Sequence, residues 1–165
     1  MQLLSESEND TDRIGRAFAE ALSGGELIAL HGNLGAGKTR FVRAVANALG
    51  CDNDVINSPT FVLWQTYHGR LRVHHLDAYR LRDSDEFLEI GGEELLWELT
   101  HAAKLDAVCF LEWAERVADV LPADRIDLSL EVTVDDQRVL RVSANGPQSQ
   151  AVLKVFESNL GKQSN

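Results

Sequence analysis

The chain has 165 residues, 44% of them hydrophobic and 25% charged, a composition typical of one folded domain. Its 16 basic and 26 acidic side chains give a formal charge of −10, which argues against nucleic-acid binding by this chain alone, because phosphates require clustered lysine and arginine. The polar, acidic N-terminus is unlike a signal sequence, and no apolar run reaches the roughly 20 residues of a membrane span. We therefore expect a cytoplasmic protein that does not engage a membrane.

The negative charge is distributed unevenly along the chain. Residues 1–82 contain nine acidic and nine basic side chains, whereas residues 83–165 contain 17 acidic and seven basic ones. Seven acidic residues and no basic one lie between Asp83 and Glu98. This acidic stretch is either a solvated helical face or a docking surface for a basic partner. The two cysteines, Cys51 and Cys109, have no metal-ligand spacing and are expected to be buried thiols.

The N-terminal third predicts a helix, a strand and a second helix. Apolar residues recur at helical spacing from Thr11 to Leu22, with a capping residue among positions 9–11. Glu26 to His31 is an apolar run of strand length, and Lys38 to Leu49 returns to helical spacing. A glycine-rich segment joins this strand to this helix, so the sequence predicts a strand, loop and helix unit.

The middle of the chain predicts a hairpin, a helix and a central strand. Thr60 to Tyr67 and Leu71 to Leu76 are strand-like, and the mixed polarity of residues 72–77 is typical of an edge strand. Glu86 to Leu99 is helical in pattern but is interrupted by glycines at 91 and 92. Val108 to Leu111 is wholly apolar, as a strand covered on both faces should be.

The C-terminal part predicts a closing hairpin and a short helix. Ile126 to Val134 and Arg138 to Ser143 alternate apolar and polar residues, which predicts antiparallel pairing and hence a mixed sheet. Gln148 to Phe156 is helical in pattern. We expect residues 1–158 to form one domain and residues 159–165 to be a disordered tail.

Residues 32–39, Gly-Asn-Leu-Gly-Ala-Gly-Lys-Thr, match the phosphate-binding loop G-x-x-x-x-G-K-[ST]. Glycines let backbone N–H groups turn toward a phosphate, and the following helix N-terminus adds partial positive charge. Lys38 is predicted to bridge the outer phosphates, and Thr39 to offer its hydroxyl to Mg²⁺. The alternative is a glycine-rich turn with an incidental lysine. With its context, the motif predicts a single α/β domain of the P-loop NTPase type, with three layers and a mixed central sheet.

Phosphoryl chemistry also requires a carboxylate at the end of a strand beside this loop. Asp77 and Glu112 each follow an apolar run. We favour Glu112 as the metal residue because its strand is wholly apolar and therefore central. Asp77 is then a second acidic group near the attacking water, a structural partner of Arg80 or Arg82, or a simple turn residue.

Three weaker signals concern the same chemistry. Thr60, in the segment Ser-Pro-Thr-Phe, is a candidate sensor of the outermost phosphate, although a turn that opens a strand explains it equally. His74 and His75 point to opposite faces of a strand, which favours one packed and one solvated histidine over a metal pair. No Asn precedes a Lys, as guanine readers usually require, so adenine is favoured, in a pocket drawing on Thr11 and the last hairpin.

Five segments, in this order and spacing, resemble the TsaE (YjeE) family of bacterial ATPases. They are the loop at 32–39, Ser-Pro-Thr-Phe at 58–61, His-Leu-Asp-Ala-Tyr-Arg-Leu at 75–81, Leu-Glu-Trp at 111–113 and Leu-Pro at 121–122. The resemblance spans about residues 8–142. The loop alone is generic, but its combination with the other segments is specific.

The resemblance implies an ATPase with ATP and Mg²⁺ as its ligands. Its role would be to support threonylcarbamoyl modification of the adenosine adjacent to the anticodon of tRNA. The chain would dock on the transferase TsaD with TsaB, so it would meet tRNA only through that complex. A small-molecule kinase and a non-hydrolysing nucleotide-dependent switch are the alternatives.

By matching position, the resemblance also assigns roles to individual residues. It implies catalytic roles for Lys38, Asp77, Glu112 and Thr60, and metal binding by Thr39 and Glu112. The implied nucleotide contacts are Thr11, Leu34, Gly35, Ala36, Gly37, Lys38, Thr39 and Arg138. The sequence departs from the family at Asn33, where Asp is usual, so a negative charge is missing beside the phosphates and we assign Asn33 no catalytic role.

Overall fold

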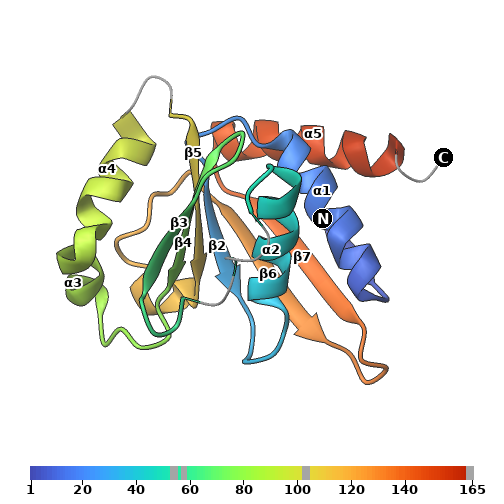
Figure 1. The fold of residues 1–165 in the computed structure, drawn as a ribbon, viewed down its shortest axis with the longest axis horizontal. Coiled ribbons are helices and arrows are strands. Elements are labelled where there is room, and N and C mark those ends of the chain that lie inside the picture. The colour runs from blue at the N-terminus through green and yellow to red at the C-terminus, as the bar shows by residue number, and fades with distance from the viewer. Residues whose placement is uncertain (53–55, 57–58, 102–104, 163–165) are drawn as a thin grey trace.

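A computed structural model describes residues 1–52, 56, 59–101 and 105–162, and it contains one seven-stranded sheet (Figure 1). The order across the sheet is β1-β7-β6-β2-β5-β4-β3. Strands β6, β2, β5 and β4 run parallel, whereas β7, β1 and β3 pair antiparallel with their neighbours. The strands are β1 (Gln2–Ser5), β2 (Leu27–His31), β3 (Trp64–Tyr67), β4 (Arg72–Asp77), β5 (Ala107–Glu112), β6 (Ile126–Val132) and β7 (Arg138–Ala144).

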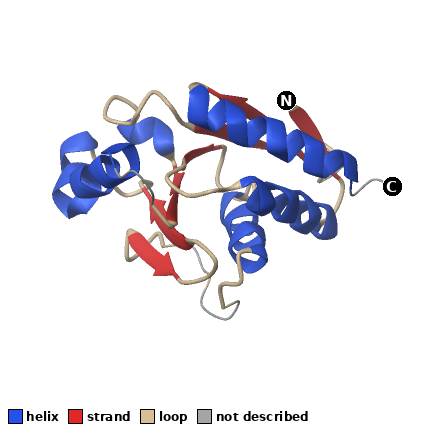
Figure 2. Ribbon diagram, turned by 90° about the horizontal axis from the view of Figure 1, so that it is seen from above, coloured by secondary structure: helices blue, strands red, loops and turns tan. Residues whose placement is uncertain are grey.

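Helices cover both faces of this sheet, as Figure 2 shows from above. One layer holds α1 (Glu8–Ala21), α2 (Lys38–Ala48) and α5 (Pro147–Lys162). The other holds α3 (Ser84–Phe87), the π-helical turn η2 (Leu88–Gly92), α4 (Glu93–His101) and the 3₁₀ turn η3 (Ala114–Val117). The predicted three-layer α/β fold with a mixed sheet is therefore confirmed. Within the described residues, none of these helices combines the length and the apolar character that crossing a membrane requires.

The central strands contribute to two separate hydrophobic cores, one on each face of the sheet. In β2, Ile28 and Leu30 pack under α1 and α2, whereas Leu27 and Ala29 belong to the core under α3 and α4. Successive side chains of a strand point to opposite faces, so both cores require apolar residues. The presence of a core on each face explains the continuous apolar runs of β2 and β5. Burial on both faces also confirms the prediction that β5 is a central strand.

The prediction that residues 72–77 form an edge strand is wrong. Strand β4 lies between β5 and β3, and every residue of it except Arg72 is buried. Its polar residues reflect buried polar contacts instead of solvent exposure. The prediction of one packed and one solvated histidine is also wrong, because His74 and His75 are only 9% and 0% exposed.

The structure contains one strand that was not predicted, β1, and one that begins later than predicted, β3. The N-terminal residues contribute β1, which pairs with β7 and was not predicted. Strand β3 begins at Trp64, because residues 60–63 form a turn in which the Leu63 amide donates to the Pro59 carbonyl at 2.6 Å. Ser58, in the same motif, lies outside the described residues.

The predicted disordered tail is wrong for residues 159–162, because helix α5 continues to Lys162. Asn159 is buried, and its side-chain amide donates to the Ala17 carbonyl of α1 at 3.2 Å. Phe156 packs edge-on against Phe18 of α1, with ring centroids 5.1 Å apart. Packing against α1 therefore extends the helix beyond its local apolar pattern.

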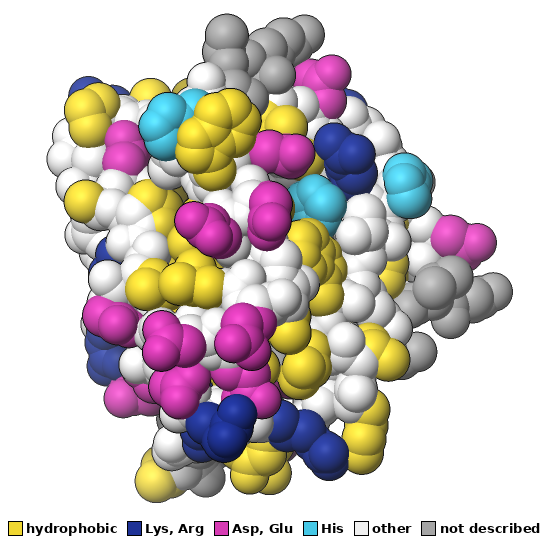
Figure 3. All heavy atoms as spheres, turned by 90° about the vertical axis from the view of Figure 1, so that its left-hand side faces the viewer, with side chains coloured by type: hydrophobic (Ala, Val, Ile, Leu, Met, Phe, Trp, Pro, Cys, Tyr) yellow, Lys and Arg dark blue, Asp and Glu magenta, His cyan; other side chains and the backbone are white. Residues whose placement is uncertain are grey.

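The acidic stretch forms the outer side of α3, η2 and α4, and Figure 3 shows acidic side chains gathered on this face. All seven acidic residues between 83 and 98 are exposed except Glu86, which is half-buried. Asp83 caps α3 by accepting the Glu86 amide at 3.0 Å. Both interpretations of the stretch, a solvated face and a docking surface, require this exposure.

Both cysteine thiols are buried, as predicted. Burial raises the pKa of Cys51 and raises the pKa of Cys109 to about 12, so neither thiol forms the reactive thiolate at neutral pH. We expect a colorimetric disulfide reagent to label neither cysteine in the native protein and both after unfolding in guanidinium. Stoichiometric labelling of the native protein within minutes would contradict this packing.

Candidate functional site

The loop between β2 and α2 requires glycine at its two ends. Gly32 has φ +136°, and a Cβ atom there would lie 2.4 Å from the Leu130 carbonyl oxygen. Gly37, which precedes α2, is in the left-handed region with φ +107°. Both conformations are unfavourable for residues other than glycine. The loop thus brings the N-terminus of α2, the positive end of the helix dipole, to the carboxyl end of β2.

Lys38 is held against the loop and against Trp113. Its side-chain Nζ donates to the carbonyl oxygens of Gly32 at 2.6 Å and Asn33 at 3.2 Å, and lies 3.9 Å from the centre of the Trp113 ring. Burial lowers the pKa of Lys38, while the carboxylates of Glu112, Glu115 and Asp77 act in the opposite direction. The lysine is 4% exposed, so its interactions with charge are weakly screened by water.

The end of β5 brings Glu112 to the start of α2. Glu112 is 3% exposed, and its Oε1 accepts a hydrogen bond from Thr39 Oγ1 at 2.7 Å. Along the sheet, Glu112 pairs with Leu30 of β2 on one side and with Asp77 of β4 on the other. Thr39 and Glu112, which were predicted from the sequence to bind a metal, are therefore in direct contact.

Asp77 at the end of β4 is bonded to the turn that precedes β3. Its Oδ2 accepts from Thr60 Oγ1 at 2.6 Å, and its Oδ1 accepts the Tyr79 amide at 2.9 Å. The guanidinium of Arg80 lies over the Phe61 ring at 4.4 Å, and Arg82 contacts Glu86 at 3.4 Å. The structure thus brings Thr60 and Asp77 together, two residues that sequence reasoning connected only through a shared ligand.

Two cavities flank the loop and share part of its wall. A cavity of about 390 Å³ contains the predicted residues Thr60, Asp77 and Glu112 together with residues 34–40 of the loop. A larger cavity of about 580 Å³ is lined by the predicted residues Thr11 and Arg138. Loop residues Gly35, Gly37 and Thr39 line both cavities. All predicted site residues therefore lie around one continuous stretch of backbone.

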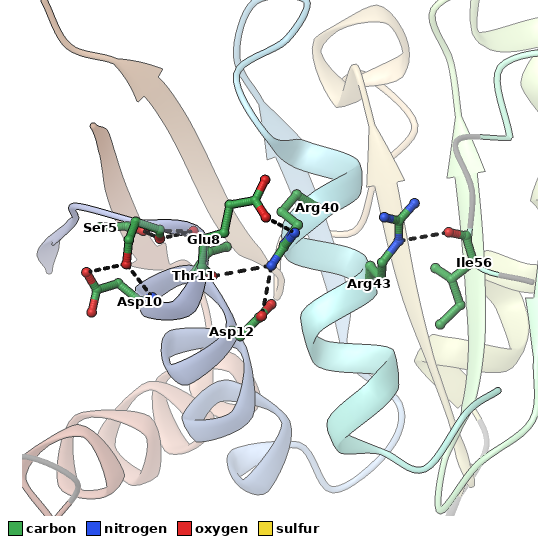
Figure 4. A network of polar contacts seen from close by, with 9 residues as sticks. Ser5, Glu8, Asp10, Thr11, Asp12, Arg40, Arg43 and Ile56 are labelled. Atoms are coloured by element: carbon green, nitrogen blue, oxygen red, sulfur yellow. Dashed lines mark hydrogen bonds and ion pairs between the residues drawn. The ribbon is translucent and has the colours of Figure 1, made fainter. Parts of the chain in front are cut away.

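Arg40 connects α1 to α2 at the edge of the larger cavity (Figure 4). Its guanidinium donates to Glu8 Oε2 at 2.7 Å and to Asp12 Oδ2 at 2.8 Å. The start of α1 is fixed by Ser7, whose hydroxyl oxygen accepts the Asp10 amide at 3.2 Å. Sequence reasoning placed the cap of α1 two or more residues too late and did not identify Arg40.

Two further residues of the site, His75 and Tyr79, were not predicted, although the sequence pattern indicated the position of His75. Nε2 of His75 lies 2.8 Å from Glu112 Oε1. His75 and Asp77 are two positions apart on one strand, so strand alternation alone places them on the same face. Tyr79, whose ring is 5.0 Å from that of Trp113, gave no such signal.

His31, the residue before the loop, holds β2 against the neighbouring strand β6. Its Nε2 lies 3.1 Å from Asp127 Oδ1, and that oxygen also accepts from Arg125 Nε at 3.1 Å. Burial alone would raise the pKa of Asp127, but the hydrogen bonds from His31 and Arg125 outweigh it and hold the pKa below its ordinary value. The ionised carboxylate therefore stabilises the fold at this point.

The pKa of Asp127 is lower in the folded than in the unfolded chain. The ionised carboxylate therefore contributes to the free energy of unfolding above the unfolded pKa of about 3.9, and this contribution is lost as pH falls below that value. We expect Asp127→Asn to lower the free energy of unfolding at pH 7 by about 1 kcal/mol. The difference from wild type should shrink between pH 5 and pH 3 in urea unfolding experiments. Asp135→Asn, an exposed turn residue, is the control, and a constant difference across this range would contradict the assignment.

The fold and the site together define an α/β domain with a P-loop NTPase-like fold, with the loop between β2 and α2 and carboxylates at the ends of β4 and β5. Residues 5–140 match the family model described as threonylcarbamoyl adenosine biosynthesis protein TsaE. The chain belongs to the TsaE family of tRNA threonylcarbamoyladenosine biosynthesis, so the resemblance is confirmed.

Individual relatives agree with this assignment. The chain is 40% identical over 143 residues to the tRNA threonylcarbamoyladenosine biosynthesis protein TsaE of Treponema pallidum, covering 87% of this chain and 100% of the relative. It is 33% identical over 138 residues to the Bacillus subtilis protein of the same name, covering 83% and 81%. The crystal structure of Bacillus subtilis YdiB is similar with a TM-score of 0.74 and 25% identity, covering 100% of this chain and 96% of that one.

Proposed function

We propose that this chain binds ATP with Mg²⁺ at the loop and hydrolyses it in support of a partner transferase, TsaD with TsaB. The reaction served would be threonylcarbamoyl modification of the adenosine adjacent to the anticodon of tRNA, in the cytoplasm. The observation that carries the proposal is the 2.7 Å contact between Thr39 and Glu112 beside Lys38. It joins the hydroxyl of the phosphate-loop motif to a buried carboxylate on a neighbouring strand.

The residues at this contact fit Mg²⁺. A hydroxyl and a carboxylate are hard oxygen ligands, and Mg²⁺ in nucleotide sites is held by one or two such groups while phosphates and water complete its shell. Within the described part of the chain, no group of three or more His, Cys, Asp or Glu could hold a metal by itself. This agrees with an ion that arrives with a nucleotide. When bound, Mg²⁺ would stabilise the negative charge of the phosphate oxygens.

The larger cavity fits the nucleoside. Its volume of about 580 Å³ is typical of small-ligand pockets, and it opens directly onto loop residues Gly35, Gly37 and Thr39. Thr11 and Arg138 line the cavity, and so does Arg43, whereas the charge of Arg40 is paired with Glu8 and Asp12. Lys38 and the α2 N-terminus would bind the phosphates between the two cavities.

Thr60 and Asp77 suit the orientation of the attacking water. The Thr60 hydroxyl donates to Asp77 at 2.6 Å, which fixes the carboxylate on the same side of the loop as Glu112. A fixed carboxylate can accept a hydrogen bond from water and hold it in line for attack. The charge of −10 supports the remaining part of the proposal, because such a chain would reach tRNA only through its partners.

The test combines complex formation with turnover. The full chain is mixed with TsaB and TsaD from the same source, in MgATP, MgADP or no nucleotide, and is analysed by size exclusion and by phosphate release. We expect nucleotide-dependent co-elution and faster phosphate release in the complex. Nucleotide-dependent co-elution without single-turnover hydrolysis would instead favour a switch protein, and phosphate transferred to an added metabolite would favour a kinase.

A further inference from the structure

A line of side chains runs from half-buried Gln65 at the edge of the sheet, through buried Tyr67 and His75, to Glu112. His75 of β4 is 0% exposed, and its Nε2 lies 2.8 Å from Glu112 Oε1. Its other ring nitrogen, Nδ1, is 3.4 Å from the Tyr67 hydroxyl of β3. That hydroxyl donates to Gln65 Oε1 at 2.6 Å, and Gln65 pairs with His75 in the sheet. The line therefore spans β3, β4 and β5.

The bond between His75 and Glu112 has a definite direction. An ionised carboxylate only accepts hydrogen bonds, so the proton lies on Nε2 and His75 donates. Within the described part of the chain, both hydrogen bonds to the Glu112 side chain, from Thr39 and from His75, go to Oε1. This arrangement fixes the rotation of the carboxyl group and leaves Oε2 as the oxygen that can turn toward a cation.

The geometry points to His75 as a positioning residue that orients Glu112 and thereby sets the affinity for Mg²⁺ in the nucleotide complex. The inference rests on the proposed function, since it concerns the same metal. Removal of a residue that forms a hydrogen bond to a metal-binding side chain typically changes the metal affinity by 10- to 100-fold. His75 is the fourth of the six residues of β4, and without this contact its imidazole would only fill the core.

The adjacent histidine supplies a matched control. His74 is also buried, but it points to the opposite face of the sheet, where Nδ1 accepts from Trp64 Nε1 at 3.2 Å. His74→Leu and His75→Leu therefore replace neighbouring buried imidazoles that each make polar contacts. They differ in whether the lost contact reaches Glu112. A role confined to packing predicts similar effects on stability and none on Mg²⁺ from either variant.

The experiment measures binding of a fluorescent ADP analogue to the full chain in EDTA and in a series of MgCl₂ concentrations, with thermal unfolding in parallel. We expect His75→Leu to raise the Mg²⁺ concentration needed for half-maximal enhancement of binding by about tenfold or more. Binding in EDTA should stay close to wild type. His75→Gln, whose longer amide can place an N–H near the position of Nε2, should restore most of the Mg²⁺ response, and His74→Leu should retain it.

Several outcomes would overturn the inference. These are a wild-type Mg²⁺ response in His75→Leu, equal shifts in His74→Leu and His75→Leu, and a response in His75→Gln as weak as in His75→Leu. If His75→Leu does not fold, His75→Asn takes its place, because its shorter amide does not reach Glu112. If nucleotide binding by the wild-type chain did not depend on Mg²⁺, this would instead contradict the proposed function. Failure of the inference about His75 and failure of the proposed function are therefore distinguishable.

Discussion

Glu112→Gln is expected to lower Mg²⁺-dependent ATP hydrolysis by about 100-fold or more, while nucleotide binding in EDTA stays close to wild type. The substitution keeps the shape of the side chain and an oxygen that can accept from Thr39 and His75, but it removes the negative charge. Loss of about 3 kcal/mol of charge stabilisation in the transition state corresponds to about 100-fold in rate. Phosphate release across a range of MgCl₂ concentrations, with and without the partner subunits, measures this.

Glu115→Gln is the matched control for this prediction. Glu115 lies three residues further along the chain, is about half exposed and contacts His31 at 3.2 Å. Its substitution removes the same charge near the loop without touching Thr39. We expect turnover close to wild type in this control. Normal hydrolysis in Glu112→Gln would show that the metal is held elsewhere.

The strand ends of the site could be predicted from the sequence because one physical rule covers them. A parallel sheet brings the carboxyl ends of its strands to one edge, so the residues after two apolar runs, Asp77 and Glu112, had to lie near the loop after β2. The wholly apolar character of β5 then identified it as central. The register confirms the consequence, since Glu112 pairs with Asp77 on one side and with Leu30 on the other.

The errors came from contacts between segments that are distant in the sequence. The polarity of β4 indicated an edge strand because a sequence does not show that His75 is bonded to Glu112, 37 residues away. Residues 159–162 were assigned to a disordered tail because their packing partner, α1, lies at the other end of the chain. Arg40 was missed for the same reason, since its partners Glu8 and Asp12 lie on another helix.

The charge balance of the site follows from these contacts as well. Lys38 interacts with the carboxylates of Glu112, Glu115 and Asp77, so three acidic groups lie around one lysine. An excess of negative charge repels polyphosphate, and the ammonium together with the α2 N-terminus has to compensate for it. If the proposed function holds, Lys38 is therefore the residue whose charge would decide whether a nucleotide binds beside these carboxylates.

Lys38→Ala is expected to weaken ATP binding by about 100-fold or more. Charge-assisted hydrogen bonds contribute about 1.5 to 3 kcal/mol each, and about 2.8 kcal/mol corresponds to a factor of 100 in affinity. The loss should exceed this bond energy, because the charge of the three nearby carboxylates would then repel the phosphates without the lysine ammonium to offset it. Titration with a fluorescent ATP analogue at fixed MgCl₂ measures the affinity.

Lys154→Ala, on the exposed side of α5, removes the same charge far from the loop and should leave the affinity unchanged. Lys38→Arg separates charge from shape, because the planar guanidinium cannot replace the compact ammonium between the loop carbonyls and Trp113. We expect this variant to bind ATP poorly despite its charge. Affinity in Lys38→Ala equal to that in Lys154→Ala would mean that the loop does not bind phosphate.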